Sequence, residues 1–268
     1  MELHGLGIAA QLPLAIQSAL ETNELDQVAQ WLLDAGPERW DEGVAALAET
    51  LADVFLEIDP ALTLGLLDQR KQRRPGPVPV RLGLLEVDAA ARAGRRQLAI
   101  DRAAELRTLT MAEDHEIRLS VLNNLGTFLK DAGAFREATL LLTEALALAG
   151  ESPRQSVTVL TNLATVSADR WVATGEAEQL RLALGRLGEA EQLCRDDPQA
   201  LGNVWFNRGF LWARGGRLAD ADAAYAAAEA AFQQAGSAPR DLAYLRRARG
   251  ALAGRAGRIT DATAAYQE

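Results

Sequence analysis

Glycine recurs through the greater part of this sequence at a nearly constant interval, and this periodicity limits the possible folds more than any other feature. The five glycines lie 39, 42, 41 and 41 residues apart: Gly94, Gly133, Gly175, Gly216 and Gly257. In every copy except the one at Gly175, an alanine follows the glycine by five residues, as in Gly133 and Ala138. Sequence periods of about 20 to 50 residues are typical of solenoids and other repeat arrays. We therefore expect one structural unit that is used several times.

Each position of the motif has a physical role in a pair of helices. Glycine adopts the left-handed backbone conformation that ends many helices, so it predicts the end of a first helix. An apolar residue two positions later predicts the start of a second helix: Phe135, Leu218 and Ile259. The alanine allows the second helix to lie close to the first. The motif therefore predicts repeated antiparallel helix pairs.

The composition supports an all-α fold. Apolar residues make up 49% of the chain but aromatic residues only 5%, so alanine and leucine, which both favour helices, supply most of the core. The fold class that we expect is a right-handed α-α superhelix of about six antiparallel helix pairs. The basic and proline-rich stretch 69–79 reads as a solvated linker, with a nucleic-acid-binding patch as the alternative. It divides an N-terminal helical arm or set of degenerate repeats, 1–75, from a repeat array, 76–268.

Within 1–75, apolar spacing and capping residues predict four helices. The first covers 8–20 and the second 25–33. The third starts near Pro37 and runs to Phe55, and the fourth opens at Asp59 and Pro60 and continues through Leu67. Asp before Pro is a favourable helix start, because Asp caps free N–H groups and Pro fits the first helical turn.

Two segments of the array carry a recognisable family pattern. They are Leu122-Asn-Asn-Leu125-Gly126-Thr-Phe-Leu129 and Trp205-Phe-Asn-Arg-Gly209-Phe-Leu-Trp212. Both resemble the first half of the tetratricopeptide repeat (TPR), and 114–150 resembles the whole repeat best. The period near 41 exceeds the usual length of about 34 residues, and such long repeats resemble those of kinesin light chains and bacterial signalling ATPases. The resemblance implies a binding scaffold.

A second resemblance concerns the start and the end of the chain. The run from Leu14 to Leu33 is similar to the helical arm that leads into the repeat sensor of maltose-regulator-type, LuxR-like transcription activators. Ser18 stands where that family usually has histidine. The last repeat stops about two turns into its second helix, so we expect a piece of a longer protein. The resemblance implies a sensor region whose ATPase module lies outside this chain.

The motifs of catalysis, metal binding and nucleotide binding are absent from the sequence. It has no glycine-rich phosphate loop and no G-x-S-x-G motif. Only two histidines are present, His4 and His115, and the single cysteine, Cys194, reads as a small core residue. The net charge of −9 disfavours direct contact with nucleic acid, and no apolar run is long enough to span a membrane. We expect a cytoplasmic protein that is not an enzyme and has no cofactor or metal.

The candidate binding residues lie on the first helices, which line the concave groove in TPR arrays. Asn124, Asn162 and Asn207 occupy the same motif position. An asparagine amide can both donate to and accept from a peptide backbone, so these residues could form a ladder for an extended peptide, as in kinesin-light-chain-like repeats. The alternative is that they cap neighbouring backbone or are solvated. Further groove candidates are Asn123, Thr127, Lys130, Thr161, Asn203, Phe206, Phe210, Arg214 and Arg247.

Two alternatives remain open at this point. Phe206 and Phe210 lie one helical turn apart and could form an apolar anchor pocket or belong to the core between repeats. The chain as a whole could bind a protein, a peptide or a small effector in its groove, as part of a bacterial signalling or transcription-regulatory protein. It could instead be a structural self-association module, in which case it would form homo-oligomers.

Overall fold

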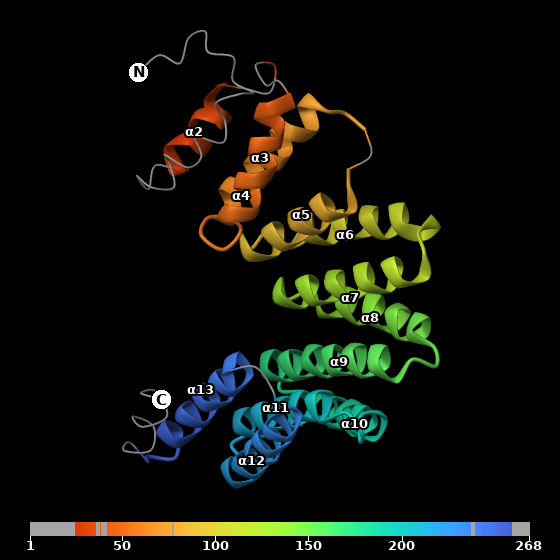
Figure 1. Cartoon of the computed structure of the whole chain (residues 1–268), viewed down its shortest axis with the longest axis vertical. Helices are drawn as coiled ribbons and strands as arrows, with labels where there is room; N and C mark the ends of the chain where they lie inside the picture. The colour runs from red at the N-terminus through yellow and green to blue at the C-terminus, as the bar shows by residue number, and fades with distance from the viewer. Residues whose placement is uncertain (1–24, 36–37, 39–41, 77, 237–238, 259–268) are drawn as a thin grey trace. The chain divides into compact units, whose positions relative to one another are not determined.

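The computed structural model describes residues 25–35, 38, 42–76, 78–236 and 239–258, and every regular element in these ranges is helical (Figure 1). The helices are α2 (Leu25–Ala35), α3 (Glu42–Phe55), α4 (Pro60–Arg73), α5 (Val80–Arg92), α6 (Arg96–Leu109), η2 (Thr110–Ala112), α7 (His115–Asp131), α8 (Phe135–Ala149), α9 (Pro153–Thr174), α10 (Ala177–Leu193), α11 (Pro198–Arg214), α12 (Leu218–Ala235) and α13 (Pro239–Arg255). The prediction of an all-α fold is confirmed. The expected helix at 8–20 and the motif residue Ile259 lie outside the described residues.

All five repeat glycines adopt the left-handed conformation, with φ between 70° and 74°. Four of these turns contain the same pattern of two backbone hydrogen bonds. At Gly133, for example, the glycine N–H donates to the Lys130 carbonyl (2.9 Å) and the Ala134 N–H to the Leu129 carbonyl (2.8 Å). Gly175, in the copy without the alanine, instead donates to the carbonyl four residues earlier, Trp171 (2.7 Å). The predicted helix ends are therefore confirmed, and the degenerate repeat has a different turn.

The chain divides into two compact units, residues 1–137 and 138–268. In the first unit, α3 packs on α4, α4 on α5, and α5 on both α6 and α7. One cluster of buried side chains in this unit includes Leu51, Phe55, Leu66 and Leu82. The motif residue Ala99 of α6 is fully buried, as the proposed close packing of helix pairs requires.

Ion pairs between helices stabilise the first unit around α5. Glu86 is only 8% exposed, and its carboxylate pairs with Lys71 of α4 (2.5 Å) and Arg102 of α6 (3.0 Å). Asp88, also buried, pairs with Arg92, and burial nevertheless raises the pKa of its carboxyl group. A buried carboxylate needs such partners, because transfer from water is costly for a charge.

The expected boundaries of the N-terminal helices need one correction. The third helix ends at Phe55 as predicted and is described from Glu42 onward, while its expected start at Pro37 lies outside the described residues. The fourth starts at Pro60, where the Asp59 carboxylate accepts from two backbone N–H groups as predicted. It continues to Arg73, however, so the solvated-linker interpretation is wrong for 69–73. Within this extension Arg70 is buried, and its guanidinium pairs with Glu49 on α3 at 2.7 Å.

In the second unit, α9 packs along α10 and α11 along α12, while α9 also contacts α11 (Figure 1). The glycines of α11 make its pair with α12 very close. A Cβ on Gly209 would lie 2.6 Å from the Tyr225 ring, and a Cβ on Gly202 would lie 2.5 Å from the Phe232 ring. Both aromatic residues are buried, with at most 2% of their surface exposed. Small residues on the first helix thus make room for large ones on the second.

Candidate functional site

A polar hollow lies between the first helices α9 and α11 of the second unit. Its volume is about 580 Å³. The amides of Asn162 on α9 and of Asn203 and Asn207 on α11 line it together with hydroxyls from α9. The complete lining is Arg154, Val157, Thr158, Thr161, Asn162, Asp197, Gln199, Ala200, Asn203 and Asn207. Four residues of the predicted groove are therefore brought together: Thr161, Asn162, Asn203 and Asn207.

Three of the polar side chains in this hollow are oriented by bonds within their own helix. The hydroxyl of Thr161 donates to the Val157 carbonyl at 2.8 Å, and that of Thr158 donates to the Arg154 carbonyl at 3.1 Å. Asn207 donates one amide N–H to the Asn203 carbonyl at 2.9 Å. This bond supports the alternative in which asparagine satisfies nearby backbone, but it uses one of the two N–H donors of the amide and leaves its carbonyl oxygen for another partner.

Further interactions fix the helices on either side of the hollow. Near the C-terminal ends of α9 and α11, Arg214 pairs with Asp169 at 2.9 Å. Near the start of α11, the Asp197 carboxylate caps the helix by accepting from the Ala200 N–H, and the Gln199 amide donates to Asp241 on α13 at 2.9 Å. The hollow is thus a gap between two helices that one ion pair bridges, while α11 is also capped by Asp197 and tied to α13.

Phe206 and Phe210 do not form a common anchor pocket. Phe206 packs against the core of the α11–α12 pair, where its ring centroid lies 5.8 Å from that of Tyr225. Phe210 is 42% exposed, and the Arg214 guanidinium lies over its ring at 4.9 Å from the centroid. Phe206 is thus half-buried against the core while Phe210 is exposed, because positions one turn apart on a helix still differ in direction.

The remaining candidates lie elsewhere. Arg247 is exposed on α13. On α7 of the first unit, the hydroxyl of Thr127 donates to the Asn123 carbonyl at 3.1 Å, and Lys130 pairs with Asp131 at 2.6 Å. Asn124 is half-buried on the same helix. Only two of the three equivalent asparagines, Asn162 and Asn207, therefore line one hollow within one unit.

Sequence reasoning missed the residues at one end of the hollow, Arg154, Asp197 and Gln199. They precede the asparagine position of each repeat by about two to three turns. Their signal was available, because Pro153 and Pro198 mark the starts of α9 and α11 and so place these residues at equivalent depths.

Among the residues that the structure describes, there is little support for a metal site, for a reactive His115 or Cys194, or for a membrane span. These residues contain no group of three or more His, Cys, Asp or Glu side chains that could hold a metal ion. His115 is exposed in the first turn of α7, and Cys194 is only 3% exposed, with a thiol pKa raised by burial. None of the described helices is both long enough and apolar enough to cross a membrane.

The helix pairs, their glycine turns and their close small-on-large packing define an all-α helical solenoid of the TPR-like class. Solved structures with this fold include BtubC (BKLC) from P. vanneervenii, which is 18% identical, with 88% of each chain covered and a TM-score of 0.52. They also include a Rap protein complexed with Competence and Sporulation Factor, which is 14% identical, with 94% of this chain and 74% of that chain covered and a TM-score of 0.52. No family model and no curated protein matches the sequence.

Proposed function

We propose that this protein is a non-enzymatic interaction scaffold that binds an extended peptide segment of a protein partner between α9 and α11. The observation that carries the proposal is the convergence of three asparagine amides and two threonine hydroxyls on one hollow of about 580 Å³. An extended peptide presents N–H and C=O groups along its length, and asparagine can bond to both. Such contacts hold the peptide backbone with little regard to its side chains.

The size and form of the hollow support a peptide. It lies between two neighbouring helices, and its polar groups are neutral amides and hydroxyls over most of the lining. The TPR-like fold is compatible with this use, since the matched Rap structure holds Competence and Sporulation Factor. A single exposed cation, Arg154, could contact a carboxylate of the ligand.

The test begins with panning of phage-displayed linear peptides on the full chain. Selected peptides are then measured by fluorescence anisotropy against the parent and an Asn162→Ala, Asn207→Ala double variant. We expect the double variant to bind about tenfold or more weakly, because each lost amide removes at least one hydrogen bond of about 1 kcal/mol.

A matched control keeps this test specific. Gln192→Ala, Gln233→Ala removes two exposed amides from the second helices α10 and α12, away from the hollow. This control should bind like the parent. Equal affinity of the asparagine variant and the parent, or equal weakening in both double variants, would contradict the proposal.

We further propose that this binding serves a sensor within a signalling or transcription-regulatory protein, as the resemblance of residues 14–33 implies. Transcript profiles of the source organism would test this. A strain that carries the Asn162→Ala, Asn207→Ala variant should reproduce the transcript changes of a strain that lacks the protein. The absence of any transcript change in either strain would contradict a regulatory role.

A further inference from the structure

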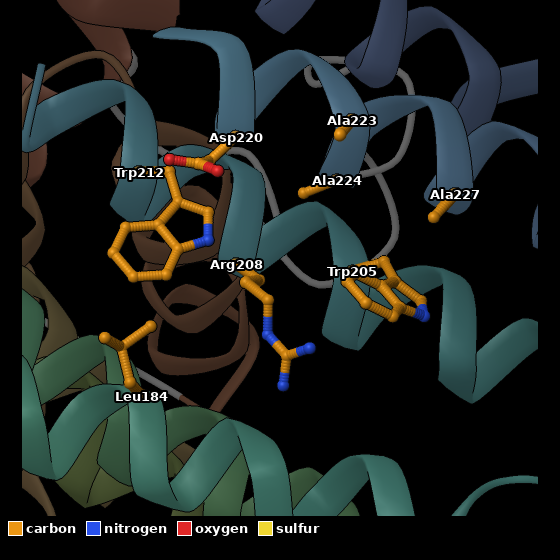
Figure 2. Close-up of a pocket in the computed structure, with 8 residues that line it drawn as sticks. All are labelled: Leu184, Trp205, Arg208, Trp212, Asp220, Ala223, Ala224 and Ala227. Atoms are coloured by element: carbon orange, nitrogen blue, oxygen red, sulfur yellow. The ribbon is translucent and has the colours of Figure 1, made fainter. Parts of the chain in front are cut away.

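A second hollow in this unit is lined by aromatic and small side chains of α10, α11 and α12. Its volume is about 470 Å³, within the range of about 300–1,000 Å³ that is usual for small-molecule sites. Figure 2 shows two tryptophans of α11 on either side of it, with an arginine between them and alanines of α12 across from them. The residues that matter here are Leu184, Trp205, Arg208, Trp212, Ala223 and Ala227.

Two features of the sequence keep this hollow open. Trp205 and Trp212 are seven residues apart, so both project from the same face of α11. The facing positions of α12 are alanines, which are too small to fill the space between the indoles. On α10, Gly188 lies one turn beyond Leu184 on the same helix face, and a Cβ built on it would meet no atom within 4 Å. Packing within the chain therefore gives no reason for this mid-helix glycine, which costs about 0.5–1 kcal/mol relative to alanine.

Arg208 places a guanidinium at the wall of this apolar space. Its side chain extends between the indoles toward the helix that carries Leu184 (Figure 2). One terminal nitrogen pairs with Glu191 of α10 at 2.8 Å, and the guanidinium lies 4.5 Å from the centroid of the Trp205 ring. Glu191 is not among the residues that line the hollow. The other nitrogens of the guanidinium remain as donors, and a fork of parallel N–H groups matches a carboxylate.

The one carboxylate in the lining is already neutralised. Asp220 pairs with Arg217 at 2.5 Å, and the Arg217 guanidinium lies 4.0 Å from the centroid of the Trp212 ring. A ligand that enters the hollow therefore meets aromatic walls, a small-residue wall and one guanidinium with donors to spare. A cationic ligand would find the faces of both indoles already approached by arginine.

From this arrangement we propose that the hollow is a binding site for a small planar aromatic carboxylate. The ring would lie among Trp205, Trp212 and the alanines of α12, and the carboxylate would accept from Arg208 in competition with Glu191. This site is separate from the polar hollow between α9 and α11, so it would give the scaffold a small-molecule ligand in addition to a peptide.

The test uses indole-3-acetate as the probe and the indole N–H signals of the ¹⁵N-labelled full chain as the readout. Trp205→Phe and Trp212→Phe variants assign their two signals among the five tryptophans. We expect saturable shifts of the Trp205 and Trp212 signals with indole-3-acetate, and binding about tenfold or more weaker with tryptamine, which carries a cation in place of the carboxylate. No shift of these two signals up to the solubility of the probe, or equal binding of tryptamine, would overturn the proposal.

Four variants separate this site from a general effect on the fold. Arg208→Gln should weaken binding about tenfold or more, and Glu191→Gln should strengthen it several-fold, because it removes the competing carboxylate. Ala227→Leu should abolish binding by filling the hollow, while Ala226→Leu, which adds the same group at an exposed position of α12, should bind like the parent. Unchanged binding in Ala227→Leu would contradict the site. Shifts that depend on protein concentration without probe would show that a second copy occupies the hollow, and the proposal would then be wrong.

Discussion

The carboxylate of Asp169 on α9 and the guanidinium of Arg214 on α11 are joined by an ion pair of 2.9 Å between residues 45 positions apart. The same guanidinium lies over the ring of Phe210, one turn earlier on α11. One side chain thus links two consecutive first helices and covers an exposed aromatic ring. This pair is a direct contact between α9 and α11, the two helices that border the polar hollow.

We predict that this ion pair contributes little to global stability. Both side chains are about one-third exposed, at 31% and 37%, and pairs of this kind are worth about 0.2–1 kcal/mol. A double-mutant cycle with Asp169→Asn and Arg214→Gln, followed by urea unfolding, measures the coupling directly. A coupling well above 1 kcal/mol would show that the solvent screens the pair less than its exposure implies.

The glycines of the second unit should respond to alanine in opposite directions. Gly209→Ala should destabilise the protein by about 1–3 kcal/mol, because the new methyl group would overlap the buried Tyr225 ring. Gly185→Ala should stabilise it by about 0.5–1 kcal/mol, since a Cβ on this residue of α10 meets nothing within 4 Å and alanine favours the helix. Thermal and urea unfolding of the two variants provide the measurement, and the same sign for both would refute the packing of α11 on α12 described here.

Tyr225 should make stability depend on pH in the alkaline range. Burial raises the pKa of its phenol from 10.0 to about 12. Between these values the unfolded chain releases the proton while the folded chain keeps it, so the stabilising contribution is complete below pH 10 and is lost as the pH rises toward 12. By about pH 11 the parent should lose about 1 kcal/mol that a Tyr225→Phe variant keeps. Urea unfolding of both proteins at about pH 8 and about pH 11 checks this, and parallel pH profiles would contradict it.

The turn glycines should be more sensitive to substitution than their exposure implies. A Cβ on Gly216 would meet no atom within 4 Å, yet its φ of 74° is unfavourable for residues with a side chain. We expect Gly216→Ala to cost about 1–2 kcal/mol and Gly216→Asn to cost less, because asparagine tolerates the left-handed region. Urea unfolding of both variants tests the order, and an unchanged stability in Gly216→Ala would mean that the turn can adopt another conformation.

Much of the fold follows from local signals in the sequence. Backbone conformation at Gly133 or Gly216 depends on a few neighbouring residues, and so does the cap at Asp59, so these features were predictable. The extension of α4 to Arg73 was not, because the burial of Arg70 and its pairing with Glu49, which lies far away in the sequence, arise only from packing.

The candidate site was predictable in part for the same reason. Equivalent motif positions place Asn162 and Asn207 on corresponding turns of α9 and α11, and the structure brings them to one hollow. Whether Phe206 packs toward the core depends on the side chain that faces it from α12, Tyr225. The positions of two helices that face each other are set by tertiary packing, not by the local sequence. The hollow between the tryptophans needs three helices at once, so no single stretch of the sequence indicates it.

The shared turn of the repeats has a consequence for how such a chain can change during evolution. At Gly94, Gly133 and Gly216 the link between two helices is closed by backbone atoms of that turn alone. A duplicated or deleted stretch of one period therefore carries its own turn with it, and the adjoining turns keep their geometry. Genes for chains of this kind can gain or lose whole helical hairpins by recombination without further changes to the loops. Each new hairpin supplies another first helix on which a binding residue can evolve.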